Sequence, residues 1–118
     1  MTGEEFAKNM EVEIMEETFN RYFSMLKTID KSTINNQLWK KVAALYDSVN
    51  AENKENIQAL VRLVMIDVIS NIFGKLDGIS SFADQSYPLE VKCGDDVISG
   101  DLQETFLMNI EDKGYLDA

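Results

Sequence analysis

The chain has 118 residues, of which 45% are hydrophobic and 27% are charged, a balance typical of one globular domain. Its 21 acidic residues outnumber its 11 basic residues and give a net charge of −10. This charge argues against nucleic acids and anionic membrane surfaces as partners, because both are bound through Lys and Arg side chains. It permits a basic protein partner, although acidity also keeps many small proteins soluble.

The chain contains no histidine, and Cys93 is its only cysteine. Without histidine, neither a Ser-His-Asp nor a Cys-His catalytic arrangement can form, and zinc sites of mixed Cys and His ligands are excluded. A single cysteine cannot form an internal disulfide, and the acidic opening stretch MTGEEFAKNMEVE does not resemble a signal peptide. These features predict a cytoplasmic protein without a cofactor.

The first predicted element is a helix over about Gly3–Ile29. Thr2 and Glu5 form a capping-box pattern at its start. Its apolar residues recur at helical spacing: Phe6, Met10, Ile14, Phe19, Tyr22, Phe23 and Leu26. The other face is rich in acids, including Glu11 and Glu16, and we interpret it as a solvated surface rather than a metal site.

A run of turn-forming residues, DKSTINNQ, separates this helix from a second one over about Asn36–Ser48. Trp39 and Tyr46 are seven residues apart and therefore share a face of the second helix. They are either core aromatics or a pair that anchors a partner, since aromatic residues dominate both settings.

The third predicted helix spans about Ala51–Leu76, between an N-cap at Asn50 and a stop at Gly78. Three polar residues share one face of its C-terminal half, as a solvent face or as a binding groove: Asp67, Asn71 and Lys75. Apolar residues occupy that side of the N-terminal half, which we therefore expect to be buried: Leu60, Leu63 and Val64. Arg62 falls within the apolar arc, where we expect it to extend toward solvent or to pair with a carboxylate.

The third helix is also the most apolar part of the chain, but we do not expect it to span a membrane. Its longest uninterrupted apolar run is Leu63–Ile66, whereas a span needs about twenty predominantly apolar residues. The pattern instead favours a central core helix.

Two short strands, Leu89–Lys92 and Val97–Ser99, are predicted to form a hairpin around the turn CGDD. A last helix, DLQETFLMNIEDK, follows, with Asp101 and Glu104 as a second capping box and Gly114 as its end. The sequence therefore predicts a mainly α fold of the α+β type, with about four helices and one small late hairpin in a single compact domain over residues 1–118.

The stretch CGDDVISGD carries a thiol and three carboxylates, yet it lacks the pattern of a catalytic or metal site. Asp95 and Asp96 beside Cys93 disfavour a reactive thiolate. Asp95, Asp96 and Asp101 do not have the spacing of an EF-hand loop, and a hairpin turn plus an N-cap accounts for all three. No phosphate-binding glycine loop is present either. We therefore predict neither a catalytic residue nor a metal ligand.

The C-terminal part of the chain is the most acidic. Residues 89–118 carry eight acids but only two bases, Lys92 and Lys113. If the partner is charged, we expect it to bind here. The residues predicted to contact it are Glu90, Asp95, Asp96, Asp101, Glu104, Glu111 and Asp112.

The motifs NIFGKLDGISSF, LEVKCGDDVIS and GDLQETFL together resemble small uncharacterised bacterial proteins. In those proteins an apolar helix ends in F-x-x-L-D-G and a later helix carries L-x-x-x-F. Some of them are thought to act as immunity proteins for secreted toxins. The resemblance covers roughly residues 60–110, and no functional residue carries over from it.

The expected function is a non-catalytic, acidic protein-binding module, such as an inhibitor or immunity protein that covers a basic partner. One alternative is a structural homo-oligomer, for instance a homodimer, whose apolar helices pack against a twin. The other alternative is an enzyme that uses carboxylates and a divalent metal ion.

Overall fold

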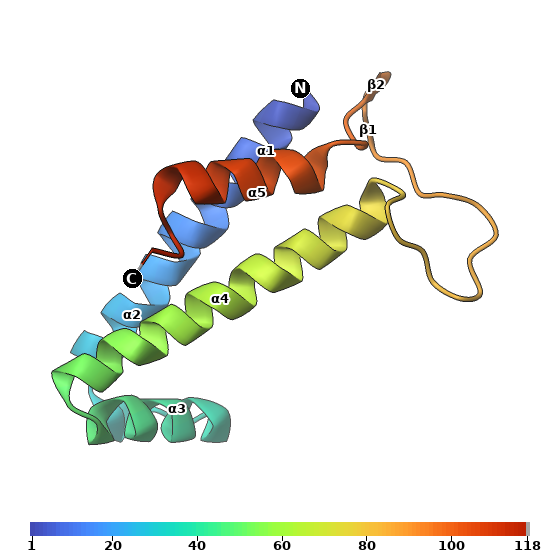
Figure 1. Ribbon diagram of the computed structural model, residues 1–118. Helices are drawn as coiled ribbons and strands as arrows, with labels where there is room; N and C mark the ends of the chain where they lie inside the picture. Colours follow the sequence, from blue (N-terminus) through green and yellow to red (C-terminus); the bar gives the residue numbers. More distant parts are fainter. Residues whose placement is uncertain (118) are drawn as a thin grey trace.

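A computed structural model describes residues 1–117 and confirms the mainly helical class, with four helices and one small late hairpin (Figure 1). The first helix is continuous and consists of α1 (Gly3–Glu11), a π-helical segment (Val12–Thr18) and α2 (Phe19–Thr28). The other elements, in chain order, are a 3-10 turn (Lys31–Thr33), α3 (Gln37–Ser48), α4 (Ala51–Leu76), β1 (Lys92–Cys93), β2 (Asp96–Val97) and α5 (Leu102–Lys113).

Local capping residues begin three of the helices where the sequence predicts. The Thr2 hydroxyl accepts a hydrogen bond from the Glu5 backbone N–H at 3.1 Å. The side chains of Asn36 and Asn50 accept equivalent bonds at the starts of α3 and α4. At the other end of α4, Gly78 has a φ of +77°, a left-handed conformation that stops a helix at little cost for glycine.

The hairpin is real but shorter than predicted. Lys92 pairs with Val97 and Cys93 with Asp96, so the predicted turn residues Cys93 and Asp96 belong to the strands instead. Only two residues remain in the loop. The first of them, Gly94, has a φ of +63°, as a tight two-residue hairpin loop requires.

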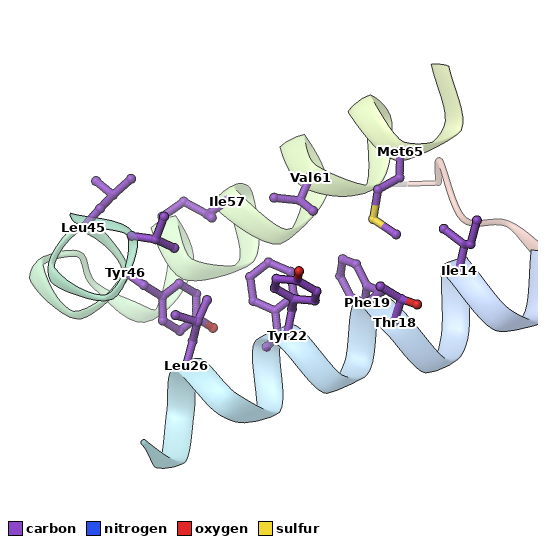
Figure 2. Close-up of a pocket in the computed structure, with 12 residues that line it drawn as sticks. Ile14, Thr18, Phe19, Tyr22, Leu26, Leu45, Tyr46, Ile57, Val61 and Met65 are labelled. Carbon is purple, nitrogen blue, oxygen red and sulfur yellow. The ribbon is translucent and has the colours of Figure 1, made fainter. Parts of the chain in front are cut away.

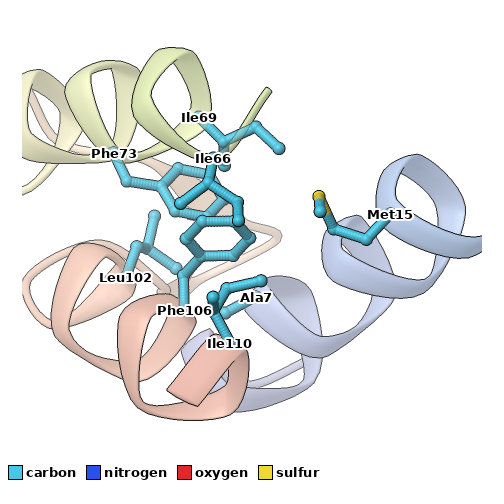
Figure 3. Packing of buried hydrophobic residues seen from close by; sticks show 8 residues of the cluster. All are labelled: Ala7, Met15, Ile66, Ile69, Phe73, Leu102, Phe106 and Ile110. Atoms are coloured by element: carbon cyan, nitrogen blue, oxygen red, sulfur yellow. The ribbon is translucent and has the colours of Figure 1, made fainter. Parts of the chain in front are cut away.

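The main core lies where α5 packs against α1 and α4 (Figure 1). Figure 3 shows its buried side chains: Ala7, Met15, Ile66, Ile69, Phe73, Leu102, Phe106 and Ile110. The rings of Phe73 and Phe106 meet edge to face with centroids 5.6 Å apart, a favourable aromatic geometry. A second, smaller cluster joins α2 to α3 through Phe19, Phe23 and Tyr46.

The π-helical segment keeps both halves of the first helix in contact with the rest of the fold. Its buried residues repeat every four positions: Ala7, Glu11, Met15, Phe19 and Phe23. In an α-helix, side chains four residues apart differ by about 40° in direction around the helix axis. Over four such steps the last buried residue, Phe23, would point away from the core. A π-helical turn accommodates one extra residue and cancels that drift. The Thr18 hydroxyl donates to the Glu13 carbonyl at 2.9 Å within this segment.

Glu11 is fully buried, so its predicted place on a solvated face is wrong. Lys113 on α5 places its Nζ 3.0 Å from Glu11 Oε2 and 3.0 Å from Glu16 Oε1. The Tyr115 hydroxyl donates to Glu16 Oε1 at 3.2 Å. Hydrogen bonds to Glu16 and Glu11 raise the pKa of Lys113, and the bond from Lys113 lowers the pKa of Glu16. The acidic stretch therefore ties the first helix to the end of α5.

The start of α5 is capped by Asp77, the residue that follows α4, rather than by a residue next to α5. Asp101 makes no side-chain cap, so the predicted second capping box is wrong. Instead, Asp77 Oδ1 accepts from the backbone N–H groups of Gly100 at 2.7 Å and Leu102 at 3.1 Å. Asp77 Oδ2 accepts from the N–H of Gln103 at 2.8 Å.

Candidate partner-binding groove

An apolar hollow of about 440 Å³ lies between the first helix, α3 and α4 (Figure 2). Figure 2 shows side chains from all three helices converging on it. Residues that line it include Phe19, Tyr22, Leu26, Val42, Leu45, Ile57, Val61 and Met65. None of the lining residues is charged, so the hollow suits an apolar ligand.

Two aromatic residues hold α3 in position beside this hollow. Tyr46 is buried; its ring lies 5.7 Å from that of Phe23, and its hydroxyl accepts a hydrogen bond from Gln58 at 3.0 Å. Trp39 stacks on Tyr22 with centroids 5.4 Å apart. The pair predicted to share a face therefore attaches α3 to its neighbours, while Leu45 of α3 stays 57% exposed at the rim.

A second apolar hollow of about 300 Å³ continues along the same helices toward the C-terminal end of α4. Ile14 and Met65 line both hollows, so the two adjoin. Val64, Val68 and Ile72 of α4 form one wall of the second hollow, which is also lined by uncharged residues alone. We call the two adjoining hollows the apolar groove.

The prediction that this side of the N-terminal half of α4 is buried is wrong. Leu60, Leu63 and Val64 are 61%, 48% and 53% exposed. The first helix and α5 pack against α4 on one side, and α3 contacts it near Ile57 and Gln58, whereas no described element covers the side with Leu60, Leu63 and Val64 (Figure 1). An apolar residue on this helix is therefore buried only if it points toward one of these neighbours.

The polar strip of α4 lies at the surface, as the solvent-face interpretation requires. Asp67 and Asn71 are exposed, and Lys75 is half-buried with its Nζ 4.5 Å above the ring of Phe82. Since Val68 and other apolar residues stand beside them, this surface is mixed rather than polar.

Arg62 is partly exposed and pairs with no carboxylate among residues 1–117, so of the two predicted alternatives the ion pair is wrong. Its guanidinium lies 4.3 Å from the centroid of the Phe19 ring, a cation–π contact. The residue thereby joins α4 to the middle of the first helix.

By length and composition alone, α4 is long and apolar enough to cross a membrane. The shortness of its uninterrupted apolar runs therefore does not by itself exclude that α4 crosses a membrane. Arg62, Asp67, Asn71 and Lys75 interrupt the helix and weigh against a span, because each is costly within lipid.

All seven residues of the predicted acidic surface are exposed, but they do not gather into one site. Four belong to the solvent side of α5 and its N-terminus: Asp101, Glu104, Glu111 and Asp112. The other three lie on or beside the hairpin, where Glu90 pairs with Lys92 at 3.6 Å and Asp96 lies 3.9 Å from the N-terminal amine.

Cys93 is exposed on the hairpin. Within the described part of the chain, no group of three or more His, Cys, Asp or Glu side chains is placed to hold a metal ion. The apolar groove is thus the most developed concave feature among the described residues. The sequence does not indicate it, because its apolar residues have the helical spacing of ordinary core positions. No protein-family model, curated protein or solved structure matches this chain.

Proposed function

We propose that this protein is a non-catalytic protein-binding module whose apolar groove holds an apolar segment of a partner protein. The observation that carries the proposal is the open groove itself, with hollows of about 440 and 300 Å³ and no charged lining residue. Large exposed apolar patches on soluble proteins commonly mark interaction sites, because leaving them in water is unfavourable.

An amphipathic helix is the partner segment that best suits this shape. The first helix, α4 and α5 resemble three members of a helical bundle, and the groove lies where a further helix would pack. A helix with apolar residues at i, i+3, i+4 and i+7 presents a continuous stripe to such a groove. Exposed Leu45 and Tyr22 at the rim supply the leucine and aromatic contacts that anchor bound helices.

The charge of the chain favours a basic partner. The net charge of −10 attracts a basic protein over long range and speeds their encounter. No ion pair within residues 1–117 involves Asp101, Glu104, Glu111 or Asp112, so these carboxylates are available to a partner. A cytoplasmic inhibitor or immunity protein for a basic toxin is the specific form of this proposal, and the resemblance over residues 60–110 supports it.

Nothing that lines the groove supports the alternative of a divalent-metal enzyme. Such an enzyme needs carboxylates around a concave site. The carboxylates of this chain lie instead on exposed helix faces, at helix ends and in ion pairs.

A pull-down with matched variants tests the proposal. Leu45→Glu places a charge at the groove rim, and Leu107→Glu places the same charge on α5, outside the groove. Wild type and Leu107→Glu should retain one basic protein from a lysate of the source cells, and Leu45→Glu should lose it. Moderate salt should weaken the capture by screening the charges without abolishing it. Equal retention by both variants would show that the groove is not the binding site. Equal retention of the partner at low and at moderate salt would show that charge attraction does not contribute to binding.

A further inference from the structure

The molecule exposes more surface than a monomer of its mass normally does. Its accessible surface is 8166 Å²; a folded monomer of 13.4 kDa typically exposes about 6,500 Å². Its radius of gyration is 17.5 Å, against about 13.5 Å for a globular chain of this length. The surplus of about 1,700 Å² per chain is within the range that each subunit of an obligate homodimer buries.

Much of the exposed apolar surface lies on the half of α4 that is centred on Asn71. Five residues there are between 48% and 61% exposed: Leu60, Leu63, Val64, Val68 and Ile72. A helical stripe of this kind is normally buried against another helix. Because Asp67, Asn71 and Lys75 stand among these residues, the covering surface must offer charged and polar groups as well as apolar ones. A protein surface can do so, whereas the interior of a lipid bilayer cannot.

A second copy of α4 offers matching groups in one arrangement. If two α4 helices packed in parallel about a two-fold axis, Asp67 would face its own symmetry mate, and so would Lys75. If they packed antiparallel with Asp67 at the axis, the two carboxylates would again meet and repel. With Asn71 at the axis, Asp67 of each copy lies opposite Lys75 of the other, since both are four residues from Asn71.

We propose that this exposed face of α4 is the interface of a two-fold homodimer, in which two α4 helices pack antiparallel with Asn71 at the axis. The two Asn71 amides meet there, as single polar residues do in the seams of helix pairs, where they specify register. The Asp67–Lys75 pairs lie on both sides of the axis. The apolar residues of the face fill the remaining contact.

Exposed apolar residues beyond the end of α4 extend this complementarity. Ile79 and Phe82 are 63% and 58% exposed, and the Phe82 ring lies beneath the Lys75 ammonium group at 4.5 Å. In the antiparallel arrangement, the N-terminal leucines Leu60 and Leu63 of one copy point toward this end of the other. Each copy thus covers the apolar ends of its twin.

This inference does not rest on the proposed function. Val64, Val68 and Ile72 of the dimer face also line the smaller hollow of the groove, so the dimer would cover that hollow. None of the five apolar residues of the face lines the larger hollow, where α4 contributes Ile57, Val61 and Met65. A dimer can therefore form while that hollow stays open to a partner. Leu45→Glu, the groove variant, should leave the dimer intact.

Sedimentation equilibrium of the purified protein with charge-reversal variants tests the interface. The wild type should sediment at twice the 13.4 kDa chain mass. Asp67→Lys and Lys75→Asp should each weaken dimerisation by roughly tenfold or more, since each places like charges opposite one another. The double variant, which exchanges the two charges, should recover most of the loss. Circular dichroism checks that all variants remain helical.

Disulfide formation tests the position of the axis. Asn71→Cys in a Cys93→Ser background should form a dimer under a mild added oxidant, because the two thiols meet at the axis. Glu55→Cys in the same background is the control. Its two copies would lie about 48 Å apart along the antiparallel helices and should not be joined.

A wild-type protein that stays monomeric at high concentration would overturn the proposal. So would a dimer that is indifferent to both charge reversals, or one in which Glu55→Cys is joined and Asn71→Cys is not. Flotation of the wild type with phosphatidylcholine vesicles would identify the face as a membrane surface and would also contradict the dimer.

Discussion

Asp77 Oδ2 accepts a hydrogen bond from the backbone N–H of Gln103 at 2.8 Å, so the residue after α4 caps the start of α5. The Gln103 side chain returns to α4 and donates to the Ser70 carbonyl at 2.9 Å. The reciprocal contact fixes the angle between the two helices that enclose the main core. A carboxylate at a helix N-terminus also interacts favourably with the helix dipole.

Removing this cap should destabilise the fold. Asp77→Ala leaves backbone N–H groups at the start of α5 without an acceptor and should lower the free energy of unfolding by about 1–2 kcal/mol. Urea unfolding followed by circular dichroism measures the loss. Asp101→Ala is the matched control and should change stability by less than about 0.5 kcal/mol, since Asp101 makes no side-chain cap. A larger loss in the control than in Asp77→Ala would contradict the assignment.

The ion-pair cluster around Lys113 should give the protein a defined pH dependence. Lys113→Met leaves Glu11 buried without its cation and should lower the urea midpoint at neutral pH. The lowered pKa of Glu16 means that this contribution is complete above its usual pKa of 4.5 and is lost as the pH falls below it. The raised pKa of Lys113 means that the contribution persists up to 10.5 and declines only at higher pH.

The difference between wild type and Lys113→Met should therefore stay constant between about pH 5 and pH 10 and shrink in acid. Urea midpoints for both proteins across this range provide the measurement. A difference as large at pH 3 as at neutral pH would show that the cluster stabilises through packing of the lysine stem rather than through charge.

Arg62 should contribute little net stability. Its stacking on Phe19 is worth about 0.5–2 kcal/mol. Its buried Nε has no hydrogen-bond acceptor within residues 1–117, which costs about 1–3 kcal/mol. Because the two effects offset, the free energy of unfolding of Arg62→Leu should lie within about 1 kcal/mol of the wild-type value or exceed it. A loss above about 3 kcal/mol on urea unfolding would mean that the guanidinium has a polar partner in solution.

The π-helical segment behaves as a one-residue insertion in an α-helix, and this can be tested by changing its length. Deletion of the exposed Glu13 should restore a regular helix, keep Phe19 and Phe23 on the core side, and leave the thermal midpoint unchanged or higher. Insertion of one alanine after Glu13 should instead rotate α2 by about 100° and abolish cooperative unfolding. If the deletion unfolds the protein and the insertion does not, the segment is not a one-residue insertion.

Features that depend on neighbouring residues could be predicted from the sequence. The N-caps at Thr2, Asn36 and Asn50 each bond a backbone group three residues away, so they are visible in the sequence itself. The Asp77 cap spans 26 residues to Gln103, and a nearer candidate, Asp101, has the same local signature. Only the packed structure distinguishes between the two.

The burial of residues was harder to predict than the helices themselves. The five-residue step from Ile14 to Phe19 is the sequence signal of the π-helical segment. The spacing of the other apolar residues predicts a regular helix, which places Glu11 outside the core. Leu60 and Leu63 of α4 have the composition of a core helix, yet no part of the described chain covers them. Apolar composition indicates that a surface will be covered, but not whether by the same chain or by another.

Hydrogen exchange of the captured complex tests the partner-binding groove most directly. α3 is attached mainly through Tyr46 and Trp39, so its amides should exchange readily in the free protein. If the partner occupies the groove, peptides covering α3 and residues 57–65 of α4 should gain protection, while α5 should stay unchanged. Protection confined to α5 and the hairpin, with α3 and α4 unaffected, would contradict the groove and place the partner on the acidic surface instead.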